Sequence, residues 1–353
     1  MLRAHVPPVK HPARRPPARL PLARPPPATD CRSQAAAGCR RGTGRPAVIV
    51  VVSLDPAVHV SYETKQLVPG TTHQVGRVRY RAGGRGPAVA RMLHTFGHEV
   101  VAAGLAGGTA GELIRAELAR RGVPTQFTPI AMESRRFVEV TDSCDGTTTS
   151  FAEPSPYITT EELGRLAADY RGLIDGASAV VLCGGLPDEL PPEIYGTFAT
   201  YAAEAGVPVV LDAGGSALWH GAARRPALAM PEPRSGADQA ADCARLAAVG
   251  VGAAATMSGE TVTVLTAQGE WRARLVGYGG PAAGGQAGGD GRPAMSRDAL
   301  VAGFVPGVAL GWSWPDSLKH AVSLAAAADQ AGGVDLMTYE RLLPQVVIES
   351  VIG

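Results

Sequence analysis

The sequence Ala47-Val-Ile-Val-Val-Val-Ser-Leu54 is followed at once by Asp55-Pro56. The first six of these residues are apolar, so neither face of an extended segment would be polar. A short apolar run that stops at a turn signal is typical of a strand buried on both faces of a parallel sheet. The stretch therefore predicts an α/β fold.

The sequence beyond this run alternates between two kinds of segment. Helical spacing of small and apolar residues predicts helices at 86–97, 112–121 and 193–205. Short apolar and β-branched runs predict strands at 100–103, 180–182, 209–211 and 262–266. This rhythm indicates a doubly wound, mostly parallel sheet flanked by helices on both faces.

Two stretches, 72–81 and 136–151, instead alternate apolar and polar residues. The second contains Asp145-Gly146, a strong signal for a hairpin turn. We expect strands within about 61–82 and 133–152 to form a small antiparallel β lid. The lid would lie over the carboxyl ends of the parallel strands, where open α/β sheets bind their ligands.

The first 46 residues differ from the rest, because they hold ten Pro, ten Lys or Arg and a single acidic residue, Asp30. They contain too little apolar surface to fold, so we expect a disordered leader ahead of a domain at 47–353. The leader is either a basic tail or the product of an upstream start codon wrongly chosen.

Residues 47–353 carry 23 basic and 31 acidic side chains, with no basic stripe for nucleic acid. No apolar run is long enough for a membrane helix. The five Cys form no C-x-x-C pair, which favours reduced thiols in a cytoplasmic protein.

Seven short motifs occur in the same order as in a known family. They are Leu54-Asp-Pro-Ala-Val-His59, Arg81-Ala-Gly-Gly-Arg-Gly86, Asp145-Gly-Thr147, Glu153-Pro154, Gly184-Gly-Leu-Pro187, Leu211-Asp212 and Asp298-Ala-Leu-Val-Ala-Gly-Phe304. In this order the chain resembles the PfkB carbohydrate kinases, which have the ribokinase-like fold, and most closely their 1-phosphofructokinase branch.

The resemblance implies transfer of the ATP γ-phosphoryl group, with Mg²⁺, to a hydroxyl of a fructose-phosphate-type sugar. Asp298 would be the base, although an Asp here could instead cap a helix that begins at Ala299. The family's Gly-Ala-Gly before this Asp is replaced by Met295, Ser296 and Arg297. Arg297 either presents its guanidinium to phosphate or is a surface residue with no partner.

The resemblance also implies contacts to the sugar phosphate, from Asp55, His59, Gly83, Gly84, Arg85, Arg135 and Glu153. His59 stands where the branch has Asp, so a hydrogen-bonded structural role is the alternative. Arg135 either clamps a phosphate or forms an ion pair on the lid surface.

On the nucleotide side the resemblance implies contacts from Glu232, Ser258, Gly259 and Arg297. Glu232 replaces Asn in the family's K-P-N, and a carboxylate facing ATP is repulsive unless a metal intervenes. The glycine-rich stretch at 279–291 offers a rival anion loop with Asp290 as a rival base. No metal-ligand cluster stands out.

Two functions therefore remain open at this point. One is an active sugar-phosphate kinase. The other is a catalytically impaired pseudokinase that binds a sugar phosphate or a protein and acts as a regulator. For either, the resemblance implies a homodimer formed through the β lid, whose exposed edge needs protection.

Overall fold

The computed structural model describes residues 48–232, 236–276, 295–328 and 333–351, which fall within one compact unit of residues 45–353. The expected leader and the glycine-rich stretch at 279–291 lie outside the described residues. In the described ranges, no helix has both the length and the apolar character needed to cross a membrane.

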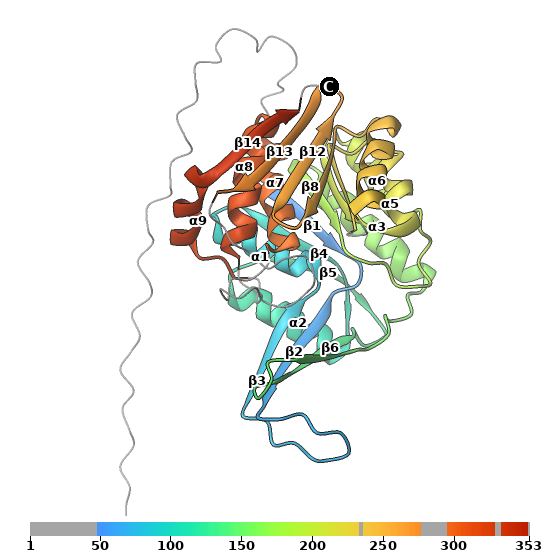
Figure 1. The fold of residues 1–353 in the computed structure, drawn as a ribbon. Coiled ribbons are helices and arrows are strands. Elements are labelled where there is room, and N and C mark those ends of the chain that lie inside the picture. Colours follow the sequence, from blue (N-terminus) through green and yellow to red (C-terminus); the bar gives the residue numbers. More distant parts are fainter. Residues whose placement is uncertain (1–47, 233–235, 277–294, 329–332, 352–353) are drawn as a thin grey trace, which may run out of the picture. The chain divides into compact units, whose positions relative to one another are not determined.

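Ten strands form one sheet in the order β14-β13-β12-β11-β10-β9-β8-β1-β4-β5 (Figure 1). The parallel strands are β1 (Val48–Ser53), β4 (Val100–Gly107), β5 (Thr125–Ile130), β8 (Ala177–Cys183), β9 (Val209–Ala213), β10 (Leu228–Pro231) and β11 (Ala253–Ser258). The antiparallel strands are β12 (Thr261–Thr266), β13 (Gly269–Leu275) and β14 (Val346–Val351). The strand expected at 262–266 thus exists, but it pairs as a hairpin with β11 and does not continue the parallel alternation.

Helices cover both faces of this sheet, as the alternation predicts. One face packs against α1 (Arg85–Thr95), α2 (Gly108–Arg120), α7 (Arg297–Leu310), α8 (Trp314–Ala327) and α9 (Leu336–Leu342), which leads into the short η1 (Leu343–Gln345). The other packs against α3 (Thr160–Ile174), α4 (Ile194–Glu204), α5 (Gly215–Ala222) and α6 (Gly236–Val249). Strand β1 serves both cores, since Val51 joins the first and Val52 joins the second.

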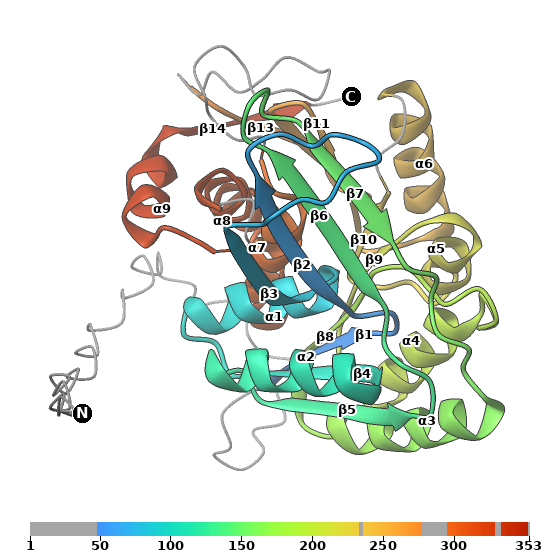
Figure 2. The same cartoon turned by 90° about the horizontal axis from the view of Figure 1, so that it is seen from below.

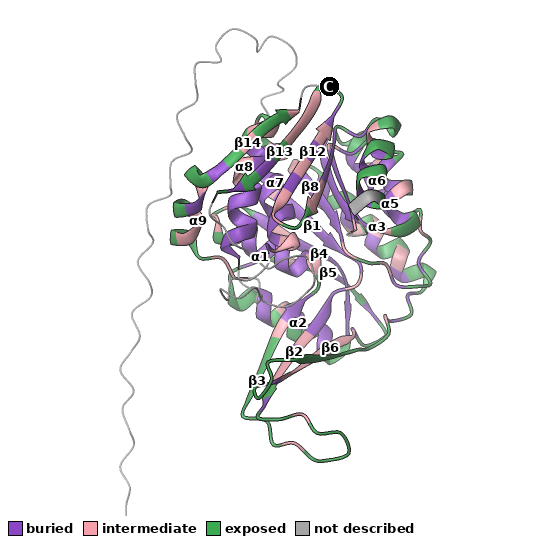
Figure 3. Cartoon of the chain, in the orientation of Figure 1, coloured by how far each residue is buried: buried purple, intermediate pink, exposed green. Residues whose placement is uncertain are grey.

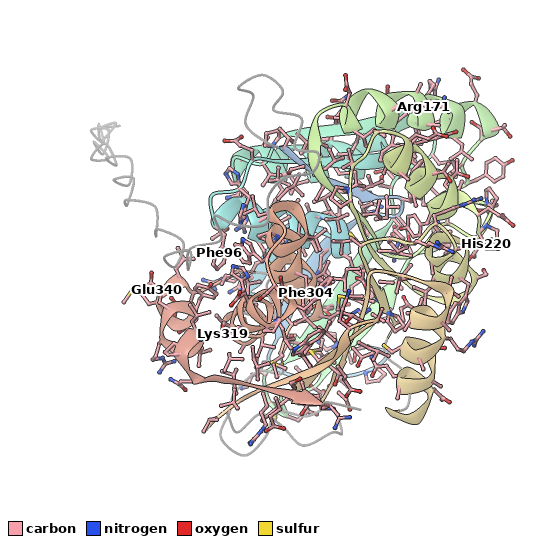
Figure 4. All side chains as sticks on the ribbon, turned by 90° about the horizontal axis from the view of Figure 1, so that it is seen from above. Phe96, Arg171, His220, Phe304, Lys319 and Glu340 are labelled. Atoms are coloured by element: carbon pink, nitrogen blue, oxygen red, sulfur yellow. The ribbon has the colours of Figure 1, made fainter. Side chains whose placement is uncertain are left out.

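Helix α7 is buried along most of its length, and Figure 3 shows it in the colour of buried residues. Phe304 of α7 is 0% exposed and lies among packed side chains, whereas Arg171 and His220 lie at the periphery in Figure 4. The amino end of α7 is therefore held firmly against the sheet.

The second sheet is the expected lid, with strand order β3-β2-β6-β7 (Figure 2). Its strands are β2 (Ala57–Thr64), β3 (Arg77–Gly83), β6 (Arg136–Asp142) and β7 (Thr148–Ala152). The hairpin at Asp145-Gly146 is confirmed, with Gly146 at φ +74°. The lid is not wholly antiparallel, because β2 and β6 pair in parallel. Strand β2 follows β1 after a short turn, so the lid begins at the carboxyl end of β1.

Candidate active site

Four segments that are far apart in the sequence meet at the carboxyl ends of β9 and β10. Asp212 lies near the end of β9 and Glu232 follows β10. Arg85 is the first residue of α1, and Arg297 is the first residue of α7. Carboxyl ends of neighbouring parallel strands share one edge of the sheet, which is why these side chains converge.

Asp212 and Arg297 form a buried ion pair. The Asp212 side chain is 0% exposed and that of Arg297 is 10% exposed. Arg297 donates to Asp212 Oδ1 from Nε at 3.1 Å and from Nη2 at 2.5 Å, and Nη2 also donates to the carbonyls of Met230 and Pro231. The interpretation of Arg297 as a surface residue without a partner is therefore wrong.

Arg85 contacts two carboxylates across the same edge. Its Nη1 lies 3.5 Å from Asp212 Oδ2, and its Nη2 lies 3.2 Å from Glu232 Oε1. Burial lowers the pKa of Arg85, but the charges of Asp212 and Glu232 outweigh that effect, so the pKa is raised overall. Arg85 is thus a fixed cation whose nearest partners are both carboxylates.

Asp298 lies in the first turn of α7, directly after Arg297. The alternative that Asp298 caps this helix is wrong, because Ser296 is the N-cap and accepts a hydrogen bond from the Ala299 N–H. Burial raises the pKa of Asp298 to about 6, aided by the charge of Asp212 and opposed by Arg85 and Arg297. A carboxylate with a pKa of about 6 is well suited to accept a proton near neutral pH.

A second cluster lies where the lid joins the large sheet. Arg135 Nε lies 2.8 Å from Asp55 Oδ2, and Ser155 Oγ donates to the same oxygen at 2.9 Å. Burial raises the pKa of Asp55, and Arg135 opposes that rise. Arg135 therefore pairs with a residue at the end of β1 and not with one on the lid surface.

The Gly83-Gly84 turn approaches this cluster closely. Gly84 has φ +90°, and a Cβ there would lie 3.6 Å from the Asp55 carbonyl oxygen. A Cβ at Gly83 would lie 2.9 Å from His59 Cβ. Both glycines are thus needed for the backbone path that delivers Arg85 to the site.

His59 lies on β2 within the lid and has partners for both ring nitrogens. Nε2 lies 2.6 Å from Glu139 Oε2, and Arg81 Nη2 lies 3.2 Å from Nδ1. The Phe137 ring packs edge-on against the imidazole. These contacts match the interpretation of His59 as a hydrogen-bonded structural histidine.

Three predicted residues have hydrogen-bond partners or turn positions outside both clusters. Glu153 accepts a hydrogen bond from the Arg136 N–H and pairs with the Arg136 guanidinium, within the lid. Ser258 and Gly259 form the turn between β11 and β12, where Gly259 has φ +58°. Asp290, the rival base, lies outside the described residues.

Two residues of the site were assigned no specific contact from the sequence. Asp212 was quoted only as part of a motif, although an acid after the apolar run Val209–Leu211 is a signal for the ligand edge of a parallel sheet. Gly214 lies beneath Glu232, since a Cβ at Gly214 would lie 2.0 Å from Glu232 Oε2. No local pattern identifies that contact.

The carboxylates at this edge do not fit a protein-bound divalent cation. Both oxygens of Asp212 face guanidinium groups, and Glu232 Oε1 faces Arg85. The described residues include no group of three His, Cys, Asp or Glu side chains placed to hold a metal ion. Guanidinium groups already face the carboxylates that a divalent cation would use as ligands.

Known proteins match this chain in sequence and in fold. The sequence model described as pfkB family carbohydrate kinase matches residues 48–230. A possible 1-phosphofructokinase from Thermotoga maritima superimposes with TM-score 0.73 at 19% identity, covering 86% of this chain and 100% of that one. Phosphofructokinase-2 from Escherichia coli, in complex with fructose-6-phosphate, gives TM-score 0.71 at 18% identity, covering 85% and 99%. A carbohydrate kinase from Agrobacterium tumefaciens gives TM-score 0.60 at 14% identity, covering 86% and 100%.

Proposed function

Because the chain belongs to the PfkB carbohydrate kinase family, we propose that it transfers a phosphoryl group to a hydroxyl of a fructose-phosphate-type sugar, with Asp298 as the base. The observation that carries the proposal is the raised pKa of Asp298 at the amino end of α7. A half-buried carboxylate in a first helical turn, with two arginines nearby, can accept a proton at neutral pH.

Kinases of this family use ATP and a divalent metal, and ATP would be the phosphate donor here. The protein's own contribution is to accept the hydroxyl proton on Asp298 as the sugar oxygen attacks phosphorus. The N–H groups at the start of α7 and the Arg85 guanidinium would face the charge on the transferred group. Because Asp212 and Glu232 are paired with arginines, we assign no step to a protein-bound metal.

The sugar end of the proposed site is the Asp55–Arg135 cluster. Asp55 Oδ2 holds Arg135 through Nε, which leaves the Nη edge of the guanidinium to contact a phosphate of the sugar. Gly83 and Gly84 would bring backbone close to the same ligand. The part played by His59 is to bind Glu139 and Arg81 and hold the lid strands together.

The proposal is tested by Asp298→Asn in the full chain, with ADP release measured in the presence of Mg²⁺-ATP and fructose 1-phosphate. Loss of the base is expected to lower the turnover number about 10² to 10⁴-fold. Binding of ATP, measured by calorimetry, is expected to persist in the variant.

Asp316→Asn is the matched control, because Asp316 also lies in the first turn of a helix with a Ser N-cap but is exposed. It is expected to keep full turnover. Equal turnover in Asp298→Asn and the unmodified protein would exclude Asp298 as the base. A folded protein that binds no ATP would exclude the kinase function altogether.

One observation favours the second candidate function, a pseudokinase that binds ligands and regulates. The guanidinium groups of Arg85 and Arg297 are already paired with Asp212 and Glu232, and Arg297 also binds two carbonyls. Arg85 could meet a phosphate only by releasing or sharing a carboxylate, and Arg297 keeps only its buried Nη1 without a hydrogen-bond partner. In the experiment above, binding of fructose 1-phosphate without ATP binding or turnover would support this candidate.

We also propose a cytoplasmic homodimer formed through the lid. Tyr80 and Phe151 lie in one cross-strand row with Val60 and Val138, by the strand register. Tyr80 is 54% exposed and Phe151 is 58% exposed. Exposed aromatic residues in one row favour burial against a second copy. The absence of a C-x-x-C pair among the five Cys favours a reducing compartment.

A further inference from the structure

The two carboxylates that contact Arg85 are held in different ways. Asp212 is 0% exposed, and its other oxygen is bound by Arg297 at 2.5 Å. Glu232 is 44% exposed, and it pairs with Arg85. An exposed pair exchanges with solvent and with competing ions far more readily than a buried one. Glu232 is therefore the carboxylate that can leave Arg85.

The position of Glu232 depends on a glycine that faces it. A Cβ at residue 214 would lie 2.0 Å from Oε2, 2.3 Å from Cδ and 2.8 Å from Cγ of Glu232. Gly214 has φ −123° and ψ 174°, which any residue adopts, so its backbone does not require glycine. What Gly214 provides is room for the Glu232 side chain to lie against Arg85.

Glu232 presents to Arg85 the chemical group that a phosphate would present. A carboxylate and a phosphate oxygen both bind a guanidinium through charge-assisted hydrogen bonds. Arg85 is itself 25% exposed, so the pair can be reached from solvent. An incoming anion would have to replace Glu232 or share Arg85 with it.

Resting on the function proposed above, we propose that Glu232 is an internal competitor for the anion site on Arg85. The Glu232 carboxylate lies against Gly214 and stays paired with the Arg85 guanidinium until a phosphate-bearing ligand displaces it. Glu232 thereby sets how tightly the chain binds its anionic phosphate donor. Removing the charge of Glu232, or the space beside Gly214 that its side chain needs, makes the Arg85 guanidinium available to a ligand.

The test uses the full chain and ATP as the probe, with binding measured by calorimetry in EDTA and again with Mg²⁺. Glu232→Gln keeps the shape of the side chain and removes its charge. Since a like charge beside the ligand opposes binding, the variant is expected to bind ATP at least about tenfold more tightly in EDTA. Glu204→Gln, at an exposed carboxylate near the end of α4, is the matched control and is expected to bind as the unmodified protein does.

Gly214→Ala is an independent test of the proposal, because it keeps every charge and only displaces the Glu232 side chain. It is expected to tighten ATP binding in EDTA by a few-fold. Adding Arg85→Met to Glu232→Gln is expected to abolish the gain. Melting temperatures of all variants show whether each is folded.

The proposal is overturned if Glu232→Gln and Gly214→Ala bind ATP no more tightly than the unmodified protein, whether or not that protein binds it. Weaker binding in Glu232→Gln, seen only with Mg²⁺, would show that Glu232 assists the ligand through a metal and would also overturn it. Tighter binding without turnover would support this inference while the kinase function fails. If neither variant changes turnover or ATP affinity, the kinase function is retained and this inference is excluded.

Discussion

The carboxyl edge of the large sheet contains one arginine–carboxylate pair that is far more deeply buried than a corresponding pair of the lid, although its second pair, Arg85–Glu232, is partly exposed. At the edge, Asp212 is 0% exposed and Arg297 is 10% exposed. In the lid, Arg136 and Glu153 are 41% and 45% exposed. Apolar groups follow the same order, since the core residues of the large sheet are buried while Tyr80 of the lid is 54% exposed.

The difference indicates two separate tasks. Charges that are buried and bound on several sides have a fixed geometry, as a site for a transferred group requires. Charges in water contribute little to stability, and exposed aromatic residues need a partner surface. Under the function proposed above, the sheet edge would serve the chemistry, and the lid would cover it and associate with a second copy.

The largest expected effect on stability comes from Arg297→Met, which leaves the Asp212 carboxylate buried beside only the more distant Arg85. Breaking a buried pair by removing one partner typically costs about 3 to 5 kcal/mol. Urea unfolding measures the loss. Arg136→Met in the lid is the control and is expected to cost less than about 1 kcal/mol. Equal losses in the two variants would contradict the distinction between edge and lid.

Asp298→Asn is expected to change how stability depends on pH. The folded pKa is about 6 and the ordinary value is 3.8, so the unfolded chain releases this proton first as pH rises. The unmodified protein therefore loses stability between about pH 4 and pH 6, by roughly 3 kcal/mol at 1.4 kcal/mol per pKa unit. The Asn variant lacks this loss and is expected to be the more stable protein at pH 7, with no advantage at pH 4.

Unfolding free energies of both proteins, measured across this pH range, give the difference directly. Asp316→Asn, at an exposed position, is expected to run parallel to the unmodified protein. Parallel curves for Asp298→Asn would mean that its carboxyl group has an ordinary pKa and is poorly suited to act as a base. The same ionisation that destabilises the fold is the one that the proposed reaction needs, so stability and activity oppose each other here.

The fold could be predicted from sequence because its signals are local. Apolar runs and helical spacing recur along the chain, and Asp145-Gly146 specifies a turn by itself. The direction of a strand is not local, which is why 262–266 was assigned to the parallel alternation although β12 is antiparallel. A short apolar run has the same pattern in both directions.

The site was predicted only in part for the same reason. Ordered motifs placed Asp298, Arg297 and Arg85 near one another, but the partners of these side chains lie 85 and 147 residues away in the chain. Ser296 took the capping role that Asp298 could have filled, and two neighbouring residues with similar propensities cannot be ranked without the backbone. Contacts such as Gly214 with Glu232 depend on tertiary packing alone.

The smallest effect on the stability of one subunit is expected from the exposed aromatic residues at the two ends of the lid row, Tyr80 and Phe151. Tyr80→Ser removes an aromatic ring that is 54% exposed, so the monomer should lose no more than about 0.5 kcal/mol. If the lid row contacts a second copy of the chain, Tyr80→Ser weakens the dimer. Sedimentation over a range of protein concentrations measures this change. Arg79→Ser is the matched control, because successive residues of β3 point to opposite faces of the lid. A dimer that survives Tyr80→Ser and the Tyr80→Ser/Phe151→Ser double variant would show that these two aromatic side chains remain in water. The contrast with the sheet edge would then concern charge alone.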